Sequence, residues 1–189
     1  MKEKPLPDAV RRFVAHWGSM GDHWGMNRSI SQVHALLYMA DAPLTAEQIA
    51  AALGMARSNV STSLKELQGW DLIRRAPLWG DRRDFFEAET DIWKVVTRIA
   101  AGRKAREIDP AAAALRECLA AASADRDVSE VAIGRLKEML EFVDRTSRWY
   151  DQMLSLPRTQ VAALMKMGSG IARFLGRGAS GAKRSASAA

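Results

Sequence analysis

The chain has 189 residues and 48% of them are apolar, so it can bury a hydrophobic core in one domain, with or without an extension. Its formal net charge of +6 favours an anionic partner, its single cysteine excludes an intrachain disulfide framework, and it lacks the run of about 18 apolar residues that a membrane span needs. The first residues also lack the apolar stretch of a secretory signal, so we expect a soluble cytoplasmic protein with no membrane partner.

Two helices are predicted before residue 40. Apolar residues between positions 5 and 20 recur at the i, i+3, i+4 and i+7 spacing of one helix face, at Val10, Phe13, Val14 and Trp17. A break that contains glycine separates this helix from a second one over about residues 28–39, which a proline-containing turn ends.

Two short helices joined by a tight turn are predicted next. Thr45 followed by Gln48 has the capping-box pattern that begins a helix, and Gly54 ends that helix. The second short helix is predicted over residues 56–67. Small polar and basic side chains share its outer face: Arg57, Ser58, Asn59, Ser61, Thr62 and Lys65.

A β-hairpin is predicted after the second short helix. Residues 70–79 have an extended pattern, residues 80–84 form a turn, and residues 85–90 return as a second strand. The turn carries Asp81, Arg82 and Arg83, and the Asp81 carboxylate is placed to hold the Arg83 guanidinium in a fork. The alternative is an ordinary solvated turn whose charges cancel.

The fold class predicted by this order is mainly α with a small β-hairpin: a winged helix-turn-helix flanked by N-terminal and C-terminal helices. Residues 1–27 form the N-terminal helix and residues 28–95 the winged helix-turn-helix. Residues 96–167 form a helical region, which includes a long apolar-striped helix at about 127–154, and residues 168–189 a flexible basic tail.

The winged helix predicts contact with double-stranded DNA. The polar face over residues 57–65 suits a recognition helix in the major groove, and Arg82 and Arg83 suit a wing that lies against the backbone or enters the minor groove. Taken alone, the polar face is equally typical of a solvated amphipathic helix. A winged helix that binds a protein partner without specific DNA binding is the alternative function.

The run ARSNVSTSLKELQGWDLIRRAPLWGDRRDFFEAETDIWKV resembles the GbsR/MarR family of bacterial transcriptional regulators. Asp81 and Arg83 match the Asp-x-Arg wing signature of the wider MarR superfamily. The resemblance implies a homodimer whose N-terminal and C-terminal helices, in residues 1–27 and 96–167, are the dimerisation helices. Each winged helix would read one half-site of a pseudo-palindromic operator. It also implies a small-molecule effector, because some relatives control choline and glycine-betaine genes.

Aromatic side chains are candidates for the effector site. Trp17, Trp24 and Trp93 lie near the expected junction of the dimerisation and winged regions, and tryptophan faces can hold a quaternary ammonium group by cation–π contact. Core packing is the simpler explanation for tryptophans at helical spacing. Cys118 is expected to be a buried or inert thiol rather than a redox sensor.

No enzymatic activity, cofactor or metal site is expected. The chain has no Gly-x-Ser-x-Gly elbow, Walker glycine loop or dinucleotide-binding glycine fingerprint after a strand. The three histidines, His16, His23 and His34, have no cysteine or carboxylate cluster at metal-ligand spacing. The sequence therefore predicts a sequence-specific transcriptional regulator, a homodimeric and ligand-responsive repressor.

Overall fold

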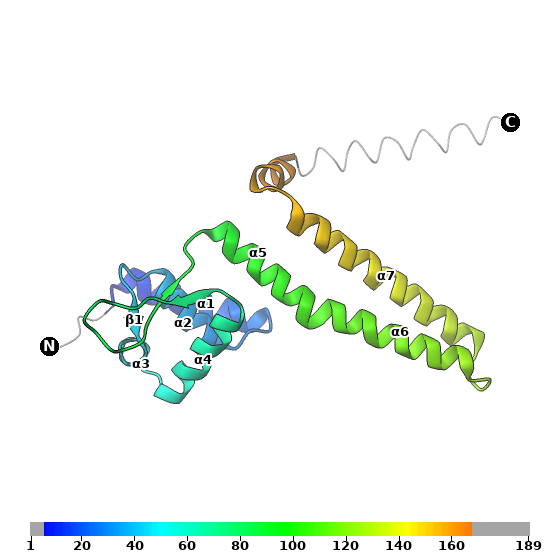
Figure 1. Ribbon diagram of the computed structural model, residues 1–189, viewed down its shortest axis with the longest axis horizontal. Helices are drawn as coiled ribbons and strands as arrows, with labels where there is room; N and C mark the ends of the chain where they lie inside the picture. The colour runs from blue at the N-terminus through cyan, green and yellow to red at the C-terminus, as the bar shows by residue number, and fades with distance from the viewer. Residues whose placement is uncertain (1–5, 168–189) are drawn as a thin grey trace. The chain divides into compact units, whose positions relative to one another are not determined.

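A computed structural model describes residues 6–167 of the chain (Figure 1). The predicted basic tail, residues 168–189, lies outside these described residues. The chain divides into two compact units, one up to Arg103 and the other from Lys104 onward.

The first unit is a winged helix-turn-helix preceded by one helix and followed by another, which confirms the predicted fold class. Its elements in chain order are α1 (Asp8–His23), α2 (Arg28–Tyr38), β1 (Leu44–Thr45), α3 (Ala46–Leu53), α4 (Arg57–Gly69), β2 (Ile73–Arg75), β3 (Phe85–Ala88) and α5 (Ile92–Arg103). The three strands form an antiparallel sheet in the order β1–β3–β2.

The core of this unit lies between the helices and the inner face of the sheet. Val33 of α2, Ile49 of α3, Val60 and Leu67 of α4, and Leu72 before β2 are each at most 1% exposed. They come from α2, from both helices of the helix-turn-helix and from the residue before β2, so their burial fixes the two helices of the helix-turn-helix against α2 and the base of the wing.

Thr45 joins the sheet to the helix-turn-helix. Its side chain accepts a hydrogen bond from the Gln48 backbone N–H (3.3 Å), and the Gln48 side chain accepts one from the Thr45 N–H (2.8 Å), as the capping box predicts. Thr45 is also the β1 residue opposite Phe85 in β3. Gly54 ends α3 with a φ of 63°, a left-handed conformation that suits glycine.

α1 packs closely against α2. A Cβ atom placed on Gly21 would lie 1.8 Å from the Ser31 Oγ, so only glycine permits this approach of the two helices. The described part of the predicted N-terminal segment, residues 6–27, therefore belongs to the same compact unit as the winged helix. Its role in dimerisation stays a prediction.

The second unit is a helical hairpin. A π-helical turn η1 (Lys104–Ile108) leads into α6 (Asp109–Ala124), and α7 (Glu130–Ser155) returns alongside α6 (Figure 1). Within the unit, the Lys104 ammonium lies 2.9 Å from an Asp109 carboxylate oxygen and 3.2 Å from an Asp151 oxygen. Cys118, expected to be a buried or inert thiol, is exposed on α6.

The structure differs from the predicted elements in the hairpin. The segment 70–79 is a strand only over Ile73–Arg75, and the residues that follow form an exposed loop in which Trp79 projects fully into solvent. The two-residue strand β1 was not predicted. It adds a third strand on the side of β3 opposite β2.

Candidate nucleic-acid interface

The outer face of α4 is polar and exposed. Val60, Ser63, Leu64 and Leu67 point into the core, because they recur at helical spacing along one face. The six predicted recognition residues all lie on the exposed side of this helix: Arg57, Ser58, Asn59, Ser61, Thr62 and Lys65. Their side chains form no hydrogen bond or ion pair within residues 6–167, so their polar atoms are available to an external partner.

The wing turn holds one of its two arginines in place. The Arg83 guanidinium donates to both Asp81 carboxylate oxygens, from Nε at 3.0 and 3.1 Å and from Nη2 at 2.6 Å, and the Arg83 backbone N–H donates to Oδ1 at 3.0 Å. The Arg83 Cζ also lies 5.3 Å from the centre of the Phe85 ring. This is the fork that the spacing of Asp81 and Arg83 predicts.

The same contacts keep Asp81 ionised. Hydrogen bonds from the Arg83 side chain, and then from its backbone, lower the pKa of the Asp81 carboxyl to about 2. The Arg82 side chain, by contrast, is exposed and forms no hydrogen bond or ion pair among the described residues. The wing thus presents one oriented guanidinium and one that is free to rotate.

A groove runs between the helix-turn-helix and the wing. It brings together Ser61 and Lys65 of α4 with Arg83 of the wing, three of the predicted residues. It also contains Arg75 of β2 and Gln68 of α4, which were not predicted to contribute. No local pattern signals Arg75, because its place in the groove follows from the register of β2 with β3.

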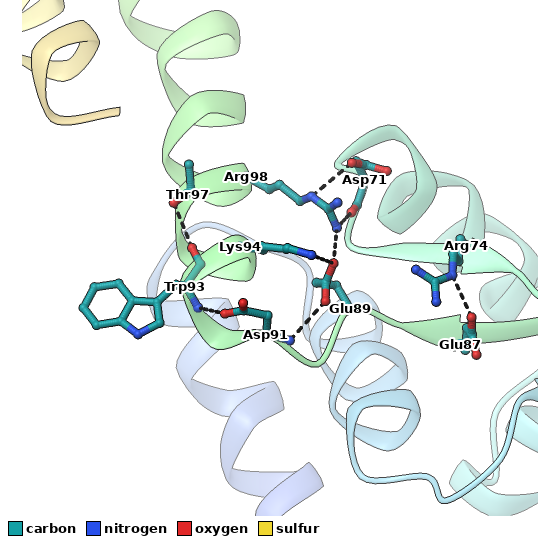
Figure 2. Close-up of polar contacts among 9 residues, drawn as sticks. All are labelled: Asp71, Arg74, Glu87, Glu89, Asp91, Trp93, Lys94, Thr97 and Arg98. Atoms are coloured by element: carbon teal, nitrogen blue, oxygen red, sulfur yellow. Dashed lines mark hydrogen bonds and ion pairs between the residues drawn. The ribbon is translucent and has the colours of Figure 1, made fainter. Parts of the chain in front are cut away.

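A polar network fixes the base of the wing to α5 (Figure 2). The Glu89 carboxylate lies 3.2 Å from the Arg98 Nη1 and 3.7 Å from the Lys94 Nζ, and it accepts a hydrogen bond from the Asp91 backbone N–H at 3.1 Å. The hydrogen bond from Asp91 is the main cause that lowers the pKa of Glu89. The Arg98 guanidinium also donates to the Asp71 carbonyl oxygen at 2.7 Å, so one side chain ties α5 to the residue that follows the wing strand β3 and to the turn after α4.

The predicted aromatic cluster forms only in part. Trp17 and Trp24 meet edge to face, with ring centres 6.4 Å apart, and both line a cavity in the first unit. Trp93 is not among the residues that line this cavity, and its ring projects away from the network of Glu89 and Asp91 (Figure 2). Trp17 and Trp24 therefore line the same cavity, and Trp93 does not line it.

Residues 6–167 contain neither a metal-binding cluster nor a membrane-spanning helix. Across residues 6–167, His, Cys, Asp and Glu side chains form no group of three or more that could hold a metal ion. Within the same range, every helix is too short or too polar to cross a membrane.

Three comparisons with known proteins agree with this geometry. The MarR family model matches residues 24–84, which run from the end of α1 to the wing turn. The HTH-type transcriptional repressor GbsR of Bacillus subtilis (strain 168) is 25% identical over 142 residues, which cover 71% of this chain and 76% of that protein. A solved structure described as a transcriptional regulator is 24% identical, with a TM-score of 0.55, and the match covers 78% of this chain and 96% of that chain. This structural likeness concerns the fold.

Proposed function

Because this chain is a DNA-binding transcriptional regulator of the MarR family, we propose that it acts as a homodimeric repressor on a pseudo-palindromic operator in the cytoplasm. The observation that carries the proposal is the unpartnered polar face of α4, which lies beside an oriented wing arginine across one shared groove. The repressive sign follows that of the GbsR relative, which is named a transcriptional repressor.

Each part of the interface has a distinct task in this proposal. The short side chains of α4, Ser58, Asn59, Ser61 and Thr62, let the backbone approach the major groove and contact base edges or phosphates. Arg57 and Lys65 add positive charge at the two ends of this surface. Arg82 and Arg83 of the wing contact the phosphate backbone or the narrow minor groove, where the negative potential is strongest, and Asp81 positions Arg83.

The proposed homodimer rests on an apolar stripe of α7 that is left uncovered in a single chain. Val131, Phe142 and Trp149 are 63%, 70% and 54% exposed, although they are large and apolar. At about 100° per residue they fall within roughly 20° of one another around the helix. Burial of this stripe against a second copy would remove apolar area from water, and a two-fold axis would present two winged helices to two half-sites.

The oligomeric state can be measured directly by analytical ultracentrifugation. Phe142→Glu, which places a charge in the centre of the stripe, is expected to shift the protein from dimer to monomer. Lys137→Glu, at an exposed position of the same helix outside the stripe, is the control and is expected to leave the dimer intact. A wild-type monomer at micromolar concentration would contradict the proposed assembly.

The operator can be found by using the full chain to select duplexes from a random pool. Fluorescence anisotropy then measures the affinity for the selected duplex and for a scrambled duplex. Arg83→Ala is expected to weaken binding to the selected duplex by about fivefold to over a hundredfold. Arg126→Ala, which removes the same charge from the turn between α6 and α7, is the matched control. Equal and weak binding to both duplexes would contradict operator recognition and favour a protein partner for the winged helix.

We also propose that a small molecule regulates DNA binding. Such a molecule changes the affinity for the operator only if it binds one arrangement of the recognition helices better than the other. The cavity lined by Trp17 and Trp24 is the proposed site, because it lies beside α2, the helix against which α4 packs.

A further inference from the structure

The wing carries a tryptophan that the rest of the described chain leaves uncovered. The Trp79 side chain is fully exposed, whereas Trp24 and Trp149 are 57% and 54% exposed. Tryptophan in a folded protein is usually buried over most of its surface, because its ring removes a large apolar area from water. Leu78, the preceding residue, is also 43% exposed, so two neighbouring apolar side chains face solvent. Such an exposed apolar site indicates an external partner.

A tight turn presents the Trp79 ring to solvent. The Asp81 backbone N–H donates to the Leu78 carbonyl oxygen at 3.2 Å and closes this turn. Trp79 and Gly80 are its two central residues, and Gly80 has a φ of 83°, the left-handed conformation that favours glycine at the third position of a β-turn. The indole therefore projects from an ordered turn.

Asp81 fixes this turn relative to the wing arginine. Its backbone N–H closes the turn that carries Trp79, and its carboxylate accepts hydrogen bonds from the Arg83 guanidinium. The apolar ring and the cationic fork therefore belong to one ordered segment, residues 79–83. When Arg83 contacts DNA, it brings Trp79 to the same part of the duplex.

The charge around Trp79 favours DNA over protein as the partner of its ring. Four arginines and two aspartates lie between residues 74 and 84, and the Arg82 side chain forms no hydrogen bond or ion pair among residues 6–167. A duplex offers phosphates to these cations and apolar base faces to the indole within one groove. The wing also borders the groove that Arg83 shares with α4, so the site continues the proposed DNA-binding surface.

We propose that Trp79 is a wedge that enters the minor groove beside the wing arginines, inserts between two stacked base pairs and kinks the operator. Stacked base pairs are about 3.4 Å apart, so opening one step admits one aromatic ring. Apolar side chains inserted in this way unstack the step and bend the duplex by about 20–90° toward the major groove. Flexible pyrimidine–purine steps such as TA and CA kink most easily, so the wedge selects such a step without a hydrogen bond to any base. This inference rests on the proposed contact of the wing with operator DNA.

The test measures affinity and bending on the same DNA. The full chain is titrated into the selected duplex, which carries a fluorescence donor and an acceptor at its two ends, so that a kink raises the transfer efficiency. Anisotropy over a salt series gives the Kd and its salt dependence. Trp79→Ala removes the wedge, Trp79→Phe keeps an aromatic ring, and Arg82→Ala removes a neighbouring charge but keeps the ring. Because Trp79 is fully exposed, both substitutions there are expected to leave folding intact.

The wild type is expected to raise the transfer efficiency on the selected duplex. Trp79→Ala should abolish most of that rise and increase the Kd by about fivefold to a hundredfold, but it should leave the salt dependence unchanged because no charge is lost. Trp79→Phe should restore most of the bend. Arg82→Ala should keep the bend and make the fall of log K with log salt less steep, by about 1 in the slope. A pool selected with Trp79→Ala should lose a pyrimidine–purine step that the wild type enriches.

The wedge is overturned if Trp79→Ala keeps the wild-type Kd and transfer efficiency on the selected duplex, a result that would favour a protein partner for the exposed ring. It is also overturned if Trp79→Ala loses affinity at an unchanged transfer efficiency, because the ring would then pack against the DNA backbone without insertion. Equal binding of the wild type to selected and scrambled duplexes would contradict operator recognition and the wedge together, so failure of the proposed function gives a different result from failure of the wedge alone.

Discussion

Asp81→Asn is expected to reduce specific DNA binding although it makes the protein more positive. In the structure the Asp81 carboxylate accepts side-chain hydrogen bonds from both the Nε and the Nη2 of Arg83. Asparagine retains one acceptor oxygen and turns an N–H₂ group toward the guanidinium, so the fork is lost and Arg83 becomes as free as Arg82.

The expected size of the effect follows from the loss of preorganisation. DNA must then immobilise the Arg83 side chain itself, and ordering one such side chain at an interface corresponds to a loss of about twofold to twelvefold in affinity. Binding to a scrambled duplex should stay equal or increase, because the variant has one negative charge fewer near the phosphates. The ratio of specific to non-specific affinity should therefore fall.

Asp41→Asn is the matched control for this prediction. Asp41 lies in the exposed turn before β1, its removal changes the net charge equally, and its side chain forms no hydrogen bond or ion pair among residues 6–167. Fluorescence anisotropy on selected and scrambled duplexes, over a salt series, measures the ratio of specific to non-specific affinity for each variant. A wild-type ratio for Asp81→Asn, or an equal fall for Asp41→Asn, would refute the positioning role of Asp81.

Three further predictions concern the groove, the buried histidine and the helix packing. Arg75→Gln should make the fall of log K for DNA binding with log salt less steep, by about 1 in the slope. Arg11→Gln on α1 should leave that slope unchanged in the same anisotropy series. Because burial lowers the His34 pKa from 6.5 to about 4, its contribution to the free energy of unfolding is complete above pH 6.5, and about 3 kcal/mol should be lost as the pH falls to 4. Urea unfolding at pH 7 and pH 4 measures this loss, which His34→Phe should abolish; an unchanged pH dependence in that variant would argue against a neutral native imidazole. Gly21→Ala should lower the unfolding free energy by about 1–3 kcal/mol, because the new Cβ would lie 1.8 Å from the facing serine hydroxyl of α2. Gly134→Ala in α7, with nothing described within 4 Å of its Cβ, should raise it by about 0.5–1 kcal/mol, and equal thermal shifts for the two variants would contradict the packing argument.

Features that depend on short stretches of sequence were predictable. The capping box of Thr45 and Gln48 needs only four consecutive residues, and the hydrogen bonds that define it are present. The pairing of Asp81 with Arg83 spans three residues of one turn. The polar and apolar faces of α4 follow from helical periodicity alone, and Val60, Leu64 and Leu67 on the apolar face are buried.

Features that depend on tertiary packing were not predictable in this way. Strand β1 has two residues and exists because it pairs with Phe85 and Phe86, about forty positions later in the chain. Arg75 enters the groove through the register of β2 with β3, which no local pattern reveals. The Ser31 hydroxyl has no hydrogen-bond partner among residues 6–167, and this depends on every group that surrounds it. In the sequence, Ser31 therefore looks like any serine on a helix.

The unpartnered side chains of α4 also bear on how the operator preference of this protein can evolve. Since Arg57, Ser58, Asn59, Ser61 and Thr62 contribute no hydrogen bond or ion pair within residues 6–167, substitutions there should have little effect on folding. A combinatorial library at these five positions should therefore consist mostly of stable variants, each free to acquire a different binding site. The wing offers no such freedom, because a change at either member of the Asp81–Arg83 pair alters the effect of a change at the other. New specificities should thus arise first on the helix, while the wing changes only in coupled steps.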